Sequence, residues 1–220
     1  MSRYFTKTLA SLEPYTPGEQ LKIADIVKLN ANENPYPPAP GVAAAVAAAV
    51  PGLRLYSDLT NGDLNASIAR HWGVRPENIL CGNGSDENLL LALRAFCDEN
   101  TPLAFADVTY SFYTVLCDLL HIPQHVIPLE SDLTIDLKKY CGLHETIVIA
   151  NPNAPTSLLA PVDAIEEVLK TNPDNIVIVD ETYVEFAPAG SSCLPLLETY
   201  DNLVITHTFS KTHNLAGARL

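Results

Sequence analysis

The chain has 220 residues, 47% of them apolar, which is enough to bury the core of one α/β domain or slightly more. Thirteen basic residues against 26 acidic ones give a formal net charge of −13, which opposes nucleic-acid binding because that needs basic surface. The longest apolar run, 42–50, is too short to span a bilayer, and the first residues lack the apolar core of a signal peptide. We expect a cytoplasmic protein that binds neither membrane nor nucleic acid.

The cysteines and histidines predict no metal centre. The cysteines are scattered and form no CxxC pair, and the histidines show no metal-ligand spacing. No Gly-x-Ser-x-Gly elbow is present to suggest a hydrolase. We expect reduced thiols and ordinary histidines, without a bound metal. The cysteines are Cys81, Cys97, Cys117, Cys141 and Cys193.

Residues 1–40 carry many prolines and little periodicity, which predicts an extended arm ahead of a large domain over 41–220. The alanine-rich segment 42–50 predicts a first helix, and 61–71, followed by Gly73 as a stop, predicts a second. Further helices are expected over 87–97, 111–120 and 161–170.

Short β-rich runs separate these helices. The run 176–179 is β-branched throughout, as expected of a strand buried on both faces. Strands that alternate with helices imply right-handed βαβ units, so we expect an α/β fold with a mainly parallel sheet. Functional sites of such sheets gather at the carboxyl ends of the strands. The expected strands are 78–81, 103–106, 125–128, 146–150, 176–179 and 203–206.

The segment after the last expected strand carries a lysine among hydroxyl groups. Thr208 and Ser210 precede Lys211, and Arg219 follows a small-residue helix start. A lysine that forms an imine must spend time neutral, and the hydroxyls and the arginine can hold a phosphate beside it. The pattern suggests a Schiff base with pyridoxal 5′-phosphate (PLP), whereas for a lysine taken alone the alternative is a solvated surface cation.

Two further groups lie at expected strand ends. The loop 82–87, Gly-Asn-Gly-Ser-Asp-Glu, opens a helix whose free N–H groups attract a phosphate, although a plain tight turn has the same pattern. Asp180 can hold a pyridine nitrogen protonated, and Tyr183 can bond the phenolic oxygen of the same ring. A solvated acid and a packing tyrosine are the alternatives. The three groups, in this chain order, favour PLP chemistry.

Together these segments resemble the PLP-dependent aminotransferases of fold type I, and among them the histidinol-phosphate aminotransferases. The likeness runs from about residue 15 to 220. It implies a three-layer α/β/α PLP-binding large domain and a homodimer. It also implies amino transfer between L-histidinol phosphate and the 2-oxo acid 2-oxoglutarate, in histidine biosynthesis. The most specific segments are 29–36 (Leu-Asn-Ala-Asn-Glu-Asn-Pro-Tyr), 82–87, 179–183 (Val-Asp-Glu-Thr-Tyr) and 210–212 (Ser-Lys-Thr).

The resemblance implies a role for each candidate residue. Lys211 is the Schiff-base lysine and the proton carrier, Asp180 pairs with the pyridinium nitrogen, and Tyr183 bonds the phenolic oxygen. Tyr110 stacks on the ring face, and Tyr56 reaches the cofactor of the neighbouring subunit. The phosphate is held by Ser85, Asp86, Thr208, Ser210 and Arg219. The substrate is covered by the arm residues Tyr15, Asn32 and Asn34.

The chain departs from the family at a few positions. Ala154 replaces an asparagine that is a second donor to the phenolic oxygen, and losing such a donor costs about 1–3 kcal/mol at a desolvated site. Asn153 is offset by one residue and should point elsewhere, while Ser157 and Pro37 replace glycines. The chain also ends just after Arg219, where the family continues into a strand and a smaller domain. We expect an incomplete large domain, no small domain and no activity of this chain alone.

Two alternatives stay open at this point. One keeps the cofactor and changes the substrate, as in an aromatic aminotransferase or a threonine-phosphate decarboxylase. The other is a non-catalytic fragment that acts only by association with another chain.

Overall fold

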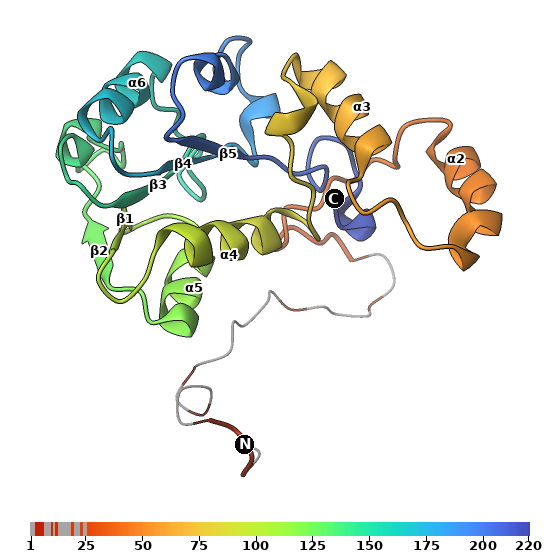
Figure 1. The fold of residues 1–220 in the computed structure, drawn as a ribbon, viewed down its shortest axis with the longest axis horizontal. Helices are drawn as coiled ribbons and strands as arrows, with labels where there is room; N and C mark the ends of the chain where they lie inside the picture. The colour runs from red at the N-terminus through yellow and green to blue at the C-terminus, as the bar shows by residue number, and fades with distance from the viewer. Residues whose placement is uncertain (1–2, 7–9, 11, 13–18, 20–22, 24–25) are drawn as a thin grey trace. The chain divides into compact units, whose positions relative to one another are not determined.

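A computed structural model describes residues 3–6, 10, 12, 19, 23 and 26–220 of the chain (Figure 1). The chain divides into two compact units, and each is described by itself. The first comprises Met1–Leu21 and Leu89–His207, and the second comprises Lys22–Asn88 and Thr208–Leu220. The expected boundary between an arm over 1–40 and a large domain over 41–220 remains a prediction.

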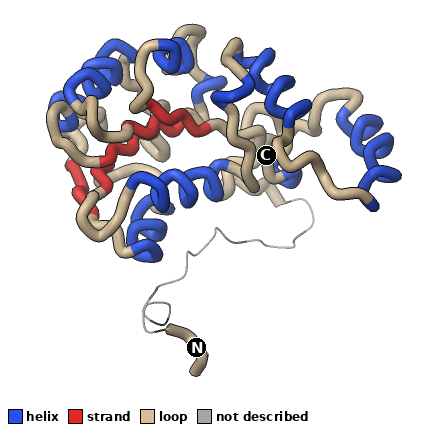
Figure 2. Tube along the Cα trace, in the orientation of Figure 1, coloured by secondary structure: helices blue, strands red, loops and turns tan. Residues whose placement is uncertain are grey.

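The first unit is built on a sheet of five parallel strands in the order β2-β1-β3-β4-β5, which confirms the expected α/β class. The strands are drawn in red in Figure 2. In β4 and β5 the register sets Asp180 opposite Thr206, so two polar side chains share one carboxyl edge. The strands are β1 Leu103–Ala106, β2 Gln124–Ile127, β3 Thr146–Ala150, β4 Val177–Asp180 and β5 Leu203–Thr206.

Helices cover both faces of this sheet, which gives the three layers (Figure 1). Alternate residues of the central strands point to opposite sides, since Val177 and Val179 join one core cluster and Ile178 joins the other. The first cluster is completed by α6 (Val162–Thr171) and the second by α4 (Ser85–Phe96) and α5 (Phe112–Leu120). The residues of β4 that precede Asp180 are apolar and buried, as the sequence of 176–179 predicts.

The second unit is helical and irregular. It contains α2 (Val42–Ala49), α3 (Gly62–Trp72) and the first turn of α4. Helix α3 ends, as expected, at Gly73, whose φ of 72° is the left-handed conformation that glycine adopts without strain. Short 3₁₀ turns lie at Val50–Arg54, Pro76–Asn78 and Ala216–Ala218 in this unit. Others lie at Leu137–Tyr140, Val184–Phe186 and Leu194–Glu198 in the first unit.

The prediction of a strand at 78–81 is wrong. Residues Pro76–Asn78 form a 3₁₀ turn, and although Ile79 is extended, none of the described strands pairs with this segment. Leu80 is 70% exposed, so the apolar run is not buried either. An extended segment becomes a strand only when a neighbouring strand takes up its backbone hydrogen bonds, and sequence pattern alone does not supply that partner.

Over the ranges that the structure describes, no helix has both the length and the apolar character needed to cross a membrane.

Candidate functional site

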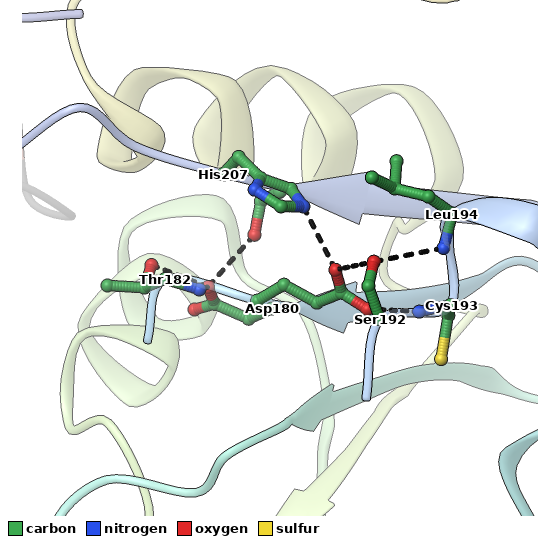
Figure 3. A network of polar contacts seen from close by, with 8 residues as sticks. Asp180, Thr182, Ser192, Cys193, Leu194 and His207 are labelled. Atoms are coloured by element: carbon green, nitrogen blue, oxygen red, sulfur yellow. Dashed lines mark hydrogen bonds and ion pairs between the residues drawn. The ribbon is translucent and has the colours of Figure 1, made fainter. Parts of the chain in front are cut away.

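Asp180, the last residue of β4, is a buried carboxylate held from several sides in the first unit. The side chain is 5% exposed. Its Oδ2 accepts a hydrogen bond from the phenol of Tyr113 at 2.6 Å. Its Oδ1 accepts from the Thr206 hydroxyl at 3.0 Å and from Thr182, through the hydroxyl at 2.7 Å and the backbone N–H at 3.2 Å (Figure 3). These bonds fix the orientation of the carboxylate.

The tyrosine that bonds Asp180 also contacts Tyr110. The ring of Tyr113, which is fully buried, meets the ring of Tyr110 edge to face, with centroids 5.6 Å apart at 88°. Phe105 of β1 packs on Tyr113 at 6.1 Å. Tyr110 and Asp180 are expected from the sequence, whereas Tyr113 and Thr206 are not. Pairing β4 with β5 in register would have predicted Thr206 beside Asp180, whereas no local sequence pattern indicates a role for Tyr113.

Glu181, next in the chain, belongs to a separate buried network. Its side chain is inaccessible to solvent and accepts hydrogen bonds from His207 Nε2 at 2.9 Å and from the Ser192 hydroxyl at 2.6 Å. The backbone N–H of Cys193 donates to its other oxygen at 2.6 Å (Figure 3). Burial, and then the nearby Glu181 carboxylate, raise the pKa of the Cys193 thiol to about 12. His207, expected to be an ordinary histidine, belongs to this buried network, which the sequence does not indicate.

Asn153, the neighbour of Ala154, makes its side-chain hydrogen bonds to other groups of the protein. It is buried, and its amide bonds the Thr109 hydroxyl at 2.7 Å and the Val108 carbonyl at 2.9 Å. A further bond of 3.2 Å reaches the Thr156 hydroxyl. Both donor bonds of the Asn153 amide therefore go to groups of the first unit.

Lys211 lies in the second unit and meets the segment that precedes α2. Its Nζ lies 3.4 Å from the carbonyl oxygen of Ala31. Asn34 donates its amide N–H to the backbone carbonyl of Lys211 at 3.2 Å and accepts from the N–H of Tyr36 at 3.1 Å. Asn34, expected to cover the substrate, therefore also supports the backbone of Lys211. Asn32 is exposed, with a φ of 51°.

The loop before α4 contains a close approach between Gly84 and Arg219. Gly84 is buried with a φ of 76°, and a Cβ there would lie 2.6 Å from a guanidinium nitrogen of Arg219. The guanidinium donates to the side-chain oxygen of Asn83 at 3.2 Å and to its carbonyl at 3.3 Å. Glycine thus lets a cation lie against the N-terminal end of a helix, where Ser85 and Asp86 begin α4.

The hydroxyls near Lys211 are also organised. Thr208, 8% exposed, donates toward the hydroxyl of Ser210 at 2.9 Å and lies 3.2 Å from the carbonyl of Leu220. The N–H of Ser210 returns a bond of 3.2 Å to the Thr208 hydroxyl. The segment is therefore a tight loop that carries Thr208, Ser210 and Lys211 on one short stretch.

An aromatic cluster packs the end of α3 on this loop. The ring of Phe209 lies 5.5 Å from Trp72 and 4.5 Å from His213. His213 in turn meets His71 at 5.5 Å. His71 and His213 thus take part in ring packing within the second unit.

The remaining expected residues are divided between the units. Asp180, Tyr110 and Tyr183 belong to the first, and the other described candidates belong to the second. Tyr183 directly follows β4 and precedes a 3₁₀ turn, and Tyr56 is fully exposed. Tyr15 lies outside the described residues.

Comparison with known proteins decides the family. Residues 24–220 match the model of aminotransferase class I and II. The chain belongs to that family. It is 45% identical over its whole length to histidinol-phosphate aminotransferase 2 of Dechloromonas aromatica, of which it covers 63%. It is 46% identical to histidinol-phosphate aminotransferase 2 of Gluconobacter oxydans, of which it covers 62%.

A solved structure gives the same result for the fold. Histidinol-phosphate aminotransferase from Sinorhizobium meliloti, crystallised with pyridoxal-5′-phosphate, is similar to all of this chain with a TM-score of 0.84 and 26% identity. The chain covers 62% of that structure. This aminotransferase-family chain thus spans somewhat less than two thirds of the length of the relatives it matches.

Proposed function

We propose that this chain carries the PLP-binding part of an aminotransferase that exchanges an amino group between L-histidinol phosphate and 2-oxoglutarate. The observation that carries the proposal is Asp180, a buried carboxylate at a strand end whose neighbours are neutral donors. Such a group suits a protonated pyridine nitrogen. The choice of substrate is supported by the relatives, which are 45% and 46% identical and are named histidinol-phosphate aminotransferases.

The second unit offers the groups that a phosphate monoester needs. The N-terminus of α4, with Ser85 and Asp86, provides backbone N–H groups and the positive end of the helix dipole. Arg219 adds a guanidinium that bonds Asn83 and lies where a Cβ at position 84 would displace it. Thr208 and Ser210 add hydroxyl donors. This donor set fits the phosphate of PLP.

The first unit offers the groups that a pyridine ring needs. Asp180 would bind the ring nitrogen, Tyr183 would donate to the phenolic oxygen, and Tyr110 would lie on the ring face. When bound, PLP would supply an electron-withdrawing ring that takes up the electron pair left at the substrate's α-carbon. Lys211 would bind the cofactor through Nζ and carry a proton to and from that α-carbon.

We also propose that the enzyme is a cytoplasmic homodimer in which Tyr56 reaches the partner's site. Its full exposure is compatible with a role outside its own unit. Asn32, Asn34 and Tyr15 would cover the substrate. Residues 1–220 by themselves should bind PLP without measurable turnover, because the matched relatives extend well beyond the portion that this chain covers.

The test combines labelling and turnover. The protein is incubated with PLP, reduced with borohydride and digested, and mass spectrometry should find the cofactor's mass on Lys211 and none in Lys211→Ala. Where the reading frame continues past residue 220, its whole product should transfer an amino group from L-histidinol phosphate to 2-oxoglutarate. Label on another lysine, or no label, would overturn the assignment. Preference for an aromatic amino acid, or release of carbon dioxide from threonine phosphate, would replace the proposed substrate.

A further inference from the structure

We propose that Tyr113 is a positioning residue for the cofactor ring, because it occupies one acceptor position of Asp180 Oδ2 and supports the ring of Tyr110. The inference rests on the proposed function, since it takes Asp180 and Tyr110 as the residues that contact PLP. Tyr113 itself would touch neither the cofactor nor the substrate.

The hydrogen bonds of Asp180 leave one acceptor position unfilled. An ionised carboxylate has about four acceptor positions, two on each oxygen. Three donors converge on Oδ1, from Thr182 through its hydroxyl and N–H and from the Thr206 hydroxyl. Among the residues that the structure describes, Tyr113 is the donor that reaches Oδ2. The second position on Oδ2 is therefore the place for the N–H of a pyridinium ring.

Tyr113 determines which way that open position faces. Its phenol is fully buried, lies 2.6 Å from Oδ2 and is carried by the first turn of α5. Contacts with Phe105 and Tyr110 hold its ring, so the hydroxyl has a fixed place. The bonds of Thr182 and Thr206 to Oδ1 hold the other half of the carboxylate. The carboxylate cannot rotate without breaking bonds on both oxygens.

The same side chain supports the expected stacking residue. The rings of Tyr110 and Tyr113 meet edge to face at 88°, a favoured aromatic arrangement. Tyr113 thus links the residue expected at the ring nitrogen to the residue expected on the ring face. The two contacts use different atoms, so Tyr113→Phe removes the bond to Asp180 and keeps the ring that supports Tyr110.

The experiment measures PLP affinity and the pH dependence of the bound cofactor's visible absorbance. Wild type, Tyr113→Phe and Asp180→Asn are compared. Tyr200→Phe is the matched control, because its phenol donates to the Glu166 carboxylate at 2.7 Å elsewhere in the same unit. Loss of a hydrogen bond to a charged group should weaken PLP binding by Tyr113→Phe about tenfold. The pH profile should move toward that of Asp180→Asn, and Tyr200→Phe should change neither reading.

The outcomes separate this inference from the proposed function. Wild type that binds no PLP would overturn the function and the inference together. Wild type that binds PLP, with Tyr113→Phe unchanged in affinity or in pH profile, would overturn the inference alone. Melting temperatures check that each variant folds. If Tyr113→Phe does not fold, 3-fluorotyrosine at this position, a stronger donor, should tighten PLP binding, and unchanged or weaker binding would refute the role.

Discussion

The imidazole Nε2 of His207 lies 2.9 Å from Oε2 of Glu181, so a buried pair joins the residue after β5 to the residue after β4. Asp180 and Thr208, the chain neighbours of this pair, are both candidate ligands of the cofactor. The pair therefore stabilises the strand ends from which the site residues extend. Ser192 and Cys193 add donors to the same carboxylate.

Glu181→Gln should destabilise the first unit. The amide nitrogen would face groups that now donate to a carboxylate, and a buried donor left unsatisfied costs about 1–3 kcal/mol. Urea unfolding followed by circular dichroism measures the loss. Glu198→Gln, the same change at an exposed glutamate in the same unit, should stay within about 0.5 kcal/mol of wild type. Equal losses in the two variants would show that the buried network does not matter.

Cys117 and Cys193 should resist alkylation in the folded protein. Burial is the main cause that raises the pKa of each thiol to about 12, far above the ordinary thiol value of 9.0. Because a raised pKa keeps the thiol protonated, little reactive thiolate exists at pH 8. Iodoacetamide should modify Cys81 before either of them, because burial raises the pKa of the Cys81 thiol less. Peptide mass spectrometry detects the order of labelling. Early labelling of Cys193 would contradict its burial beside Glu181.

Gly84→Ala should weaken PLP binding, whereas Gly142→Ala should not. Both glycines have positive φ, 76° and 68°, so alanine introduces backbone strain at each, of about 1 kcal/mol. At Gly142 the added Cβ meets nothing within 4 Å, whereas at Gly84 it would displace the Arg219 guanidinium. We expect about a tenfold weaker PLP affinity for Gly84→Ala alone, from the disturbed charge-assisted bonds. Equal PLP affinities of the two variants would contradict the assignment of Arg219 to the phosphate site.

Asp58→Asn should destabilise the start of α3 in a pH-dependent way. Asp58 accepts from the N–H of Gly62 at 2.7 Å, and this bond, followed by bonds from Thr60, lowers the pKa of Asp58 below its ordinary 3.8. A carboxyl group whose pKa is lowered in the folded state stabilises the fold at pH values above its ordinary pKa. This stabilisation is lost as the pH falls through the folded-state pKa. The gap in melting temperature between wild type and variant should therefore close on acidification below 3.8. Asp201→Asn, at an exposed aspartate, is the control, and a gap independent of pH would contradict the assignment.

Strands with a strong local pattern were predicted well. The expected strands 103–106, 146–150 and 203–206 coincide with β1, β3 and β5, and 176–179 differs from β4 by one residue. A sheet covered on both faces requires strands that are apolar on both sides. An apolar run is a local property of the sequence, so it can be recognised without the structure. The segment 78–81 has a similar pattern, yet it pairs with none of the described strands, because pairing depends on a distant partner.

The sequence alone determined the parallel α/β fold and the residues that point to PLP. Lys211, Asp180 and the Gly82–Gly84 loop are recognisable because their chemistry and spacing are local. Only the tertiary structure decided what surrounds them. The bond from Tyr113 to Asp180 joins residues 67 positions apart, and the contact of Arg219 with Asn83 joins residues 136 apart. Such contacts depend on strand register and helix packing, which a linear pattern does not encode.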